Sequence, residues 1–242
     1  MQDSRPIINL KGISYAYPGS GPVLEDLDFT FHEGDRIGLV APNGSGKTTL
    51  FHIIMGLLKP DAGTVEIFGK TAITERDFRE VRRKIGLLFQ DADDQLFSPT
   101  VLEDVAFGPL NLGKSKEEAV EISRRTLSDL GLQDFEDRIT FKLSGGEKRL
   151  VALATVLAME PRIMLMDEPS AGLDEAIKIR LIEILKSLDI STIIVSHEFD
   201  FLAELSDAVY TMQGGKIRLD AGVQLHRHVH AHVYGRQPHK HD

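Results

Sequence analysis

The chain has 242 residues, of which 42% are hydrophobic and 27% charged, as in a globular protein with one large domain or two small ones. It has no cysteine, which excludes a disulfide scaffold and thiolate metal sites and fits a reducing compartment. The net charge of −9 argues against broad contact with nucleic acid. No apolar run approaches the ~18 residues of a membrane span, and the N-terminus lacks a signal peptide, so we expect a soluble, cytoplasmic chain.

Strands are expected to alternate with helices along the chain. β-branched and aromatic residues predict strands at 6–17, 23–40, 64–69, 84–90, 162–169, 191–198 and 207–217. Apolar periodicity predicts helices at 47–58, 115–132, 144–161 and 175–188. Ser115 and Ser144 are the expected N-caps of the second and third helices. Apolar strands joined by helices indicate an α/β fold with a mainly parallel sheet covered on both faces, whose ligands lie at the carboxyl ends of the strands.

A glycine-rich loop stands between a predicted strand and helix in residues 38–54, GLVAPNGSGKTTLFHII. Its residues Gly46, Lys47 and Thr48 match the phosphate-binding pattern G-x-x-x-x-G-K-[ST], except that the opening glycine is Ala41. The backbone N–H groups of such a loop can hold phosphates at the positive end of the helix. Lys47 would reach the β- and γ-phosphates, and the Thr48 hydroxyl would ligate Mg²⁺. The alternative is a chance glycine-rich turn.

Ala41 directly follows the strand RIGLV, whereas NGSGK supplies the turn around the phosphates. A glycine would be needed at position 41 only if the backbone had a positive φ there or had no room for a methyl group. We therefore expect an ordinary negative φ at Ala41 and a functional site.

Two adjacent carboxylates, Asp167 and Glu168, end the apolar strand RIMLMDEP. Carboxylates at the end of a buried strand are costly unless they meet a cation or transfer a proton. Asp167 can hold Mg²⁺ through water, and Glu168 can orient and deprotonate an attacking water. The alternative is a solvated acidic turn before Pro169.

The segment LSGGE, residues 143–147, predicts a second anion site at a helix start. With these motifs in this order, the chain resembles the ATP-binding subunits of ABC transporters from about residue 5 to residue 222. The resemblance implies the P-loop NTPase fold of ABC ATPases, with a mainly parallel RecA-like sheet, an antiparallel β subdomain and an inserted α-helical subdomain at about residues 91–160. It implies an ATP-binding domain over residues 1–224 and leaves 225–242 as a histidine-rich tail.

The resemblance assigns roles to residues that match the family's motifs. Tyr17, with Tyr15 as the alternate, would stack on adenine, and Gln90 would contact Mg²⁺ and sense the membrane partner. His197 would contact the γ-phosphate, although a histidine at a strand end can also be an incidental polar residue. Glu168, His197 and Gln90 form the implied catalytic set, and Thr48, Gln90 and Asp167 the implied Mg²⁺ set. The implied ATP contacts are Tyr17, Asn43, Gly44, Ser45, Gly46, Lys47, Thr48, Thr49, Ser144, Gly145, Gly146 and Glu147.

The resemblance also implies a head-to-tail dimer, in which the phosphate loop of one subunit and LSGGE of the other enclose each ATP. Hydrolysis at Glu168 would reopen the dimer, and a homodimer and a heterodimer both remain open. Residues 170–174, SAGLD, match the family's D-loop. Besides Ala41, the departures from the family pattern are Glu147 in place of glutamine and Leu150 where arginine is common.

The segment between the phosphate loop and LSGGE is expected to hold one strand, a proline-containing connector and one amphipathic helix. The connector FQDADDQLFSPTVLEDVAFGP resembles that of energy-coupling-factor transporters, especially the cobalt and nickel import branch. This resemblance implies a membrane scaffold and a substrate-binding membrane subunit as partners, and a peripheral location at the cytoplasmic face of the cell membrane. The alternatives are another coupling-factor substrate such as a vitamin, or a soluble ABC ATPase that remodels nucleic acid or protein.

The tail LHRHVHAHVYGRQPHKHD holds six of the nine histidines. Neutral imidazoles suit divalent transition metals such as Ni²⁺ and Co²⁺, and both an extended and a helical tail would permit chelation. A solvated tail without a role and a purification artefact are the alternatives. The candidate metal ligands are His226, His228, His230, His232, His239 and His241.

Overall fold

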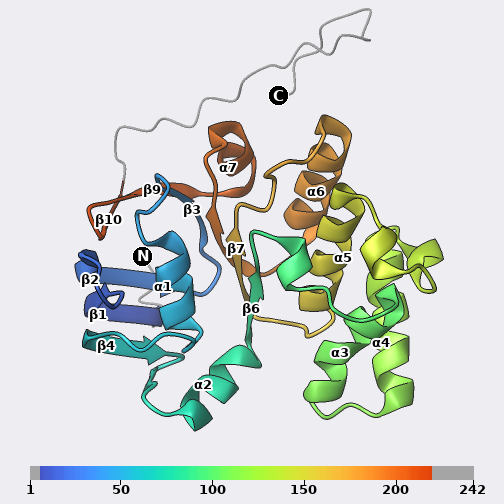
Figure 1. The fold of residues 1–242 in the computed structure, drawn as a ribbon, viewed down its shortest axis with the longest axis horizontal. Helices are drawn as coiled ribbons and strands as arrows, with labels where there is room; N and C mark the ends of the chain where they lie inside the picture. The colour runs from blue at the N-terminus through green and yellow to red at the C-terminus, as the bar shows by residue number, and fades with distance from the viewer. Residues whose placement is uncertain (1–5, 220–242) are drawn as a thin grey trace, which may run out of the picture.

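The computed structural model describes residues 6–219, which form two sheets with helices around them (Figure 1). Within these residues the larger sheet has the strand order β10-β9-β3-β8-β7-β6. Its central strands are parallel, and β10 is the antiparallel edge strand, as the mainly parallel pattern predicted. Its strands are β3 (Arg36–Val40), β6 (Ile85–Leu88), β7 (Ile163–Asp167), β8 (Ser191–Val195), β9 (Ala208–Gln213) and β10 (Lys216–Leu219).

The second sheet is antiparallel, with the order β2-β1-β4-β5 among the described residues, and it forms the predicted β subdomain. The region 23–40 is divided between the two sheets, because the turn before Asp35 contains Gly34 with φ 88° and redirects the chain into β3. The strands of this sheet are β1 (Pro6–Ala16), β2 (Pro22–His32), β4 (Ala62–Ile67) and β5 (Lys70–Thr71).

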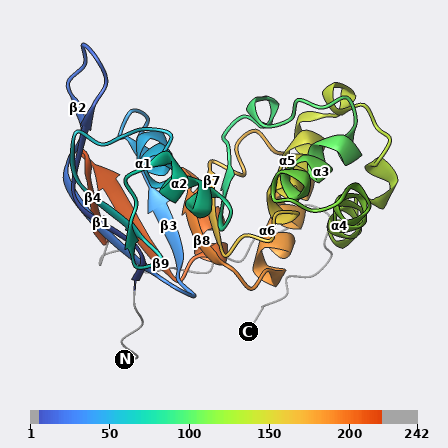
Figure 2. The same cartoon turned by 90° about the horizontal axis from the view of Figure 1, so that it is seen from below.

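Helices cover both faces of the parallel sheet (Figures 1 and 2). In β7, Ile163 and Leu165 belong to the core shared with α1 and the antiparallel sheet, whereas Met164 and Met166 belong to the core shared with α5 and α6. This alternation follows from the two-residue period of a strand, and it buries β7 on both faces. The helices are α1 (Lys47–Ile54), α2 (Glu75–Arg82), α3 (Val101–Asn111), α4 (Lys116–Asp129), α5 (Gly145–Leu157), α6 (Glu175–Ser187) and α7 (Phe199–Leu205).

Helices α2, α3 and α7 were not predicted, and the expectation of one strand, a connector and one helix before LSGGE was wrong because α2 and α3 also lie there. α2 has only two apolar residues, Phe78 and Val81, and α3 contains Gly108 and Pro109, so neither shows an apolar period over several turns. Both begin with a capping box, at Thr74 and Thr100, which is the local signal that could have revealed them. The predicted caps Ser115 and Ser144 are confirmed as the N-caps of α4 and α5.

Helix α1 is shorter than predicted, ending at Ile54 rather than near residue 58, because Gly56 turns the chain with φ 68° and packs against the ring of Phe78. Together α3, α4 and α5 stand apart from the antiparallel sheet, on the other side of β6 and β7 (Figure 1). Across residues 6–219, no helix combines the length and the apolar character required to span a bilayer.

Candidate functional site

The loop between β3 and α1 has the geometry of a phosphate cradle. Gly44 and Gly46 have φ values of 77° and 96°, and Gly46 is the N-cap of α1 without a side-chain cap. The first turn of α1 carries no acidic residue, so its N–H groups and the positive end of the helix dipole favour an anion. The Ser45 hydroxyl is buried without a hydrogen-bond partner among the described residues, and a phosphate oxygen would satisfy it.

Ala41 does not distort this loop. Among the described residues other than glycine, those with positive φ are Asp26, Phe68, Glu160 and Glu168. Ala41 therefore has the negative φ predicted for it, and its side chain is fully buried in the core beside α1. The methyl group of Ala41 packs in the core, and the residues after Ala41 form the phosphate cradle.

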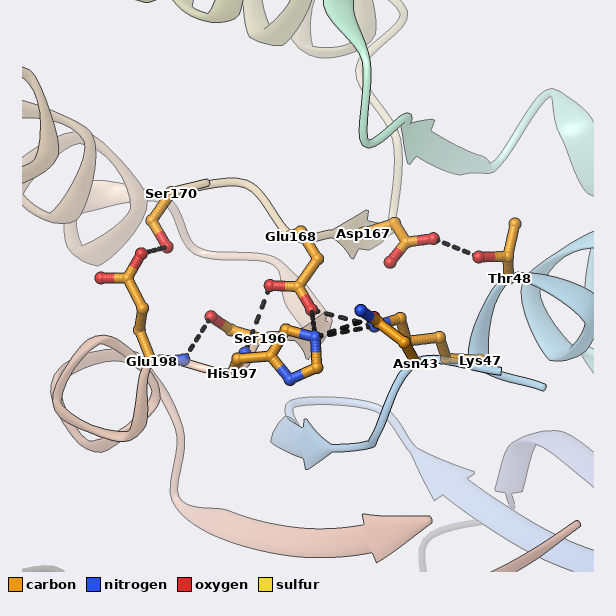
Figure 3. A network of polar contacts seen from close by, with 9 residues as sticks. All are labelled: Asn43, Lys47, Thr48, Asp167, Glu168, Ser170, Ser196, His197 and Glu198. Atoms are coloured by element: carbon orange, nitrogen blue, oxygen red, sulfur yellow. Dashed lines mark hydrogen bonds and ion pairs between the residues drawn. The ribbon is translucent and has the colours of Figure 1, made fainter. Parts of the chain in front are cut away.

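Three side chains of the predicted site meet at the carboxyl edge of the parallel sheet (Figure 3). Lys47 Nζ lies 3.1 Å from Glu168 Oε1 and 3.1 Å from His197 Nε2, while the latter two atoms are 3.0 Å apart. Asn43 Oδ1 lies 3.3 Å from Lys47 Nζ and 3.2 Å from His197 Nε2. Lys47 and Glu168 are both buried, so their opposite charges compensate each other away from water.

Glu168 reaches this cluster through an unusual backbone conformation, with φ 48°. The left-handed region costs a side-chain-bearing residue about 1–2 kcal/mol. Two backbone hydrogen bonds stabilise it: the Glu168 N–H donates to the carbonyl of Val195 at 2.9 Å, and its carbonyl accepts from Ala171 at 3.1 Å. The sharp turn directs the carboxylate back over the sheet edge toward Lys47, which is a placement that suits a reacting group.

Asp167 and Thr48 form the pair expected to hold Mg²⁺. The Thr48 hydroxyl donates to Asp167 Oδ2 at 2.7 Å, whereas Asp167 Oδ1 is buried without a partner among the described residues. A water of a hydrated Mg²⁺ would satisfy this orphaned oxygen, and a carboxylate with a hydroxyl is a suitable hard-cation set, so the residues fit the ion. Burial raises the pKa of the Asp167 carboxyl above its usual value, against the hydrogen bond from Thr48 and the charge of Lys47.

The raised pKa of Asp167 predicts that acid weakens the binding of Mg²⁺, and with it the Mg²⁺-dependent binding of nucleotide. As pH falls toward this pKa, Asp167 becomes protonated earlier than an ordinary aspartate and loses the charge that attracts the cation. The Mg²⁺ concentration for half-maximal binding of a fluorescent ATP analogue should therefore rise steeply with acidity. Asp167→Asn should flatten this rise, and the exposed control Asp189→Asn should keep it; an Asp167→Asn profile like that of the unchanged protein would contradict the assignment.

Gln90 lies after β6 and lines a cavity of about 810 Å³ together with Thr48 and Asp167. The structure thus brings this predicted residue to the same edge as the Mg²⁺ pair. The carbonyls of Phe89 and Gln90 accept hydrogen bonds from the buried guanidinium of Arg149, at 2.6 Å for Phe89. This role of Arg149 was not predicted, although position 150 beside it was noted as lacking the common arginine.

The LSGGE segment forms the start of α5, with Ser144 as the N-cap. The Ser144 N–H and hydroxyl each donate to Glu147 Oε2 at 2.8 Å, and Arg138 Nη1 lies 2.9 Å from Glu147 Oε1. The backbone and hydroxyl of Ser144 and the Arg138 charge lower the pKa of Glu147. Gly146 packs on Ile177. Within residues 6–219, no hydrogen bond or ion pair joins residues 144–147 to the phosphate loop.

Tyr17 lies beside the phosphate loop, where its hydroxyl is 3.1 Å from the Thr49 hydroxyl. Tyr17 is 40% exposed and its ring makes an edge contact with Tyr15, so part of the residue is accessible to a ligand. The tail histidines lie outside the described residues, as does the predicted boundary between residues 224 and 225. The domain division therefore stays a prediction.

Comparisons with known proteins give relatives over most of the chain. The family model described as ABC transporter matches residues 24–171. A putative ABC transporter ATP-binding protein of Nitratidesulfovibrio vulgaris is 49% identical, covering 98% of this chain and 86% of that protein. The energy-coupling factor transporter ATP-binding protein EcfA of Methanothermobacter thermautotrophicus is 41% identical, covering 87% of this chain and 69% of that protein.

Solved structures share the fold. The structure of cbiO1 from Clostridium perfringens, described as part of the ABC transporter complex cbiONQ, is 34% identical with a TM-score of 0.77, covering 88% of this chain and 87% of that chain. The ATP-binding cassette MJ0796, in a dimeric post-hydrolysis state with ADP and Pi, is 27% identical with a TM-score of 0.79, covering 88% of this chain and 97% of that chain. These similarities confirm the fold class predicted from the sequence.

Proposed function

The chain belongs to the ABC transporter family as an ATP-binding subunit that hydrolyses ATP, and on this premise we propose that it powers an energy-coupling-factor importer for cobalt or nickel. The likeness to EcfA and to cbiO1, named as part of a cbiONQ complex, supports the importer type. The connector after Gln90 supports the metal branch. Tail imidazoles, at His226 to His241, suit the same metals.

The observation that carries the catalytic part of the proposal is the contact of Lys47 with Glu168 and His197. The γ-phosphate of ATP takes the place of the Glu168 carboxylate beside Lys47, which exchanges one anion for another in the same buried position. Glu168 is then free to accept a proton from the attacking water, and His197 donates a hydrogen bond to a γ-phosphate oxygen. Thr48, Asp167 and Gln90 would hold Mg²⁺, which when bound would compensate the charge of the phosphates.

ATP is enclosed between two ATPase subunits, either two copies of this chain or this chain and a sister subunit. Residues 144–147 of one subunit supply the helix N-terminus for the nucleotide held at residues 43–49 of the other. Tyr17 stacks on the adenine. The dimer is attached at the cytoplasmic face of the cell membrane to an integral scaffold and a substrate-binding subunit, and it makes no contact with nucleic acid.

Transport by the whole complex tests the substrate. Proteoliposomes that hold this chain with its membrane subunits should take up radioactive Ni²⁺ or Co²⁺ only when Mg²⁺ and ATP are supplied. A complex with Glu168→Gln should show no uptake, because closure without hydrolysis cannot complete the cycle. ATP-driven uptake of a vitamin with no uptake of either metal would replace the metal by another coupling-factor substrate. ATP turnover indifferent to every membrane subunit would contradict the transport role.

A further inference from the structure

Glu198 joins the two loops that carry Glu168 and His197 (Figure 3). Its Oε1 accepts a hydrogen bond from the Ser170 hydroxyl at 3.0 Å, and its Oε2 forms an ion pair with Lys178 of α6. Its backbone N–H donates to the Ser196 hydroxyl at 3.0 Å. We refer to the contacts of the Glu198 carboxylate with Ser170 and Lys178 as the Glu198 tie.

Two members of the Glu198 tie lie close to the catalytic residues along the chain, so the tie can hold those residues in place. Glu198 directly follows His197, and Ser170 lies two residues after Glu168. Ser170 is only 1% exposed, so its hydroxyl depends on Glu198 for a partner. The tie therefore closes a short ring in which His197 and Glu168 are also linked directly, by the His197 N–H donating to Glu168 Oε2 at 3.2 Å.

The Glu198 tie adds a further restraint on the left-handed backbone of Glu168, beside the two backbone hydrogen bonds of that residue. A residue with φ 48° relaxes toward negative φ unless the segments on both sides of it are fixed. On its N-terminal side β7 is fixed by the sheet. On its C-terminal side, the Asp174 N-cap holds the end of the loop on α6, and the Glu198 tie holds the middle at Ser170.

We propose that Glu198 is a positioning residue for ATP hydrolysis. Its contacts with Ser170 and Lys178 hold Glu168 and His197 in their relative positions. The inference rests on the roles proposed for Glu168 and His197. It assigns to Glu198 no contact with nucleotide: the phosphate loop, Tyr17 and the Mg²⁺ pair do not touch it in the described residues. Loss of the tie should therefore lower kcat while KM for ATP is kept.

The chain offers a matched control for simple helix packing. Glu198 is the N-cap of α7, and Lys186 of α6 and Glu204 of α7 form a second ion pair between these two helices, away from Ser170 and His197. Glu204→Gln removes this α6–α7 ion pair as Glu198→Ala removes the other. If the tie served only to pack α7 on α6, the two variants would behave alike.

The test is the steady-state ATP turnover of the purified chain, with the melting temperature and the fraction of chains that bind ATP measured on the same samples. Glu198→Ala should lower kcat per ATP-binding chain at least about tenfold, because small displacements of catalytic groups are expensive in rate. KM should stay within about twofold. Glu198→Gln, which keeps an oxygen for Ser170, should recover much of the loss. Glu204→Gln should leave kcat unchanged.

Ser170→Ala gives an independent measurement where Glu198→Ala folds poorly, and it should lower kcat in the same direction. The double variant should lose little more than Glu198→Ala alone, since the two residues act through one contact. Three outcomes would overturn the proposal. They are additive losses in the double variant, a Glu204→Gln effect equal to that of Glu198→Ala, and a Glu198→Ala protein in which fewer chains bind ATP while kcat per ATP-binding chain is unchanged. Full turnover in Glu168→Gln or His197→Ala would instead show that the catalytic assignment has failed.

Discussion

Glu168→Gln should lower ATP turnover by about 10²–10⁴-fold while ATP still binds. Glutamine has the size of glutamate and keeps one oxygen, which can accept from either Lys47 or the His197 N–H, so the site retains its shape. It cannot accept the proton of the attacking water, and the chemical step stops. Phosphate release should be measured together with equilibrium binding of ATP, and size-exclusion chromatography with ATP should show a trapped dimer.

The control for Glu168→Gln is the exposed Glu183→Gln on α6, which changes the same charge outside the site and should turn over ATP normally. Retained turnover in Glu168→Gln would show that another group is the base. Lost ATP binding would show instead that the carboxylate is needed to hold the loop in its folded form, since Glu168 is 4% exposed and pairs with a buried lysine.

Gly46→Ala should abolish productive nucleotide binding, with turnover reduced about 100-fold or more. Alanine would occupy φ 96°, and its Cβ would lie 2.8 Å from Leu24 Cδ2 and 2.9 Å from Val23 Cγ1. Because alanine is strained at this φ and the sheet holds the Val23 carbonyl 3.1 Å from the Cβ, the start of α1 should move, and with it Lys47 and Thr48. ATP binding by fluorescence, with circular dichroism to confirm folding, measures the effect.

Ala41→Gly is the matched change at the other end of the loop. Position 41 has a negative φ and lies in the core, so glycine there should cost about 1 kcal/mol of stability and leave ATP affinity unchanged. Similar loss of binding in both variants would show that the whole loop, rather than its turn at Gly46, limits the site. Normal binding by Gly46→Ala would contradict the phosphate cradle.

Much of the candidate site was predictable because its signals are local. The phosphate loop, the carboxylates at the end of β7 and the cap of α5 each depend on a few residues that are neighbours along the chain. The side chains of these residues determine the local backbone conformation. The strand ends then had to meet, since parallel strands place their carboxyl ends at one edge. The helices α2 and α3 were missed because apolar periodicity is weak in short or proline-containing helices, although their caps were visible.

The sequence by itself determined the class of fold, the groups that can meet phosphate and Mg²⁺, and the conformation of the loop around Gly46. Only the tertiary structure decided that β8 lies between β3 and β7, so that His197, after β8, contacts both Lys47 and Glu168. It also decided the left-handed backbone of Glu168, the use of Arg149 to hold the loop at Gln90, and the tie at Glu198. The reason is separation along the chain: Lys47 and Glu168 are 121 positions apart, and a contact at that distance depends on strand order and burial, which no local pattern encodes.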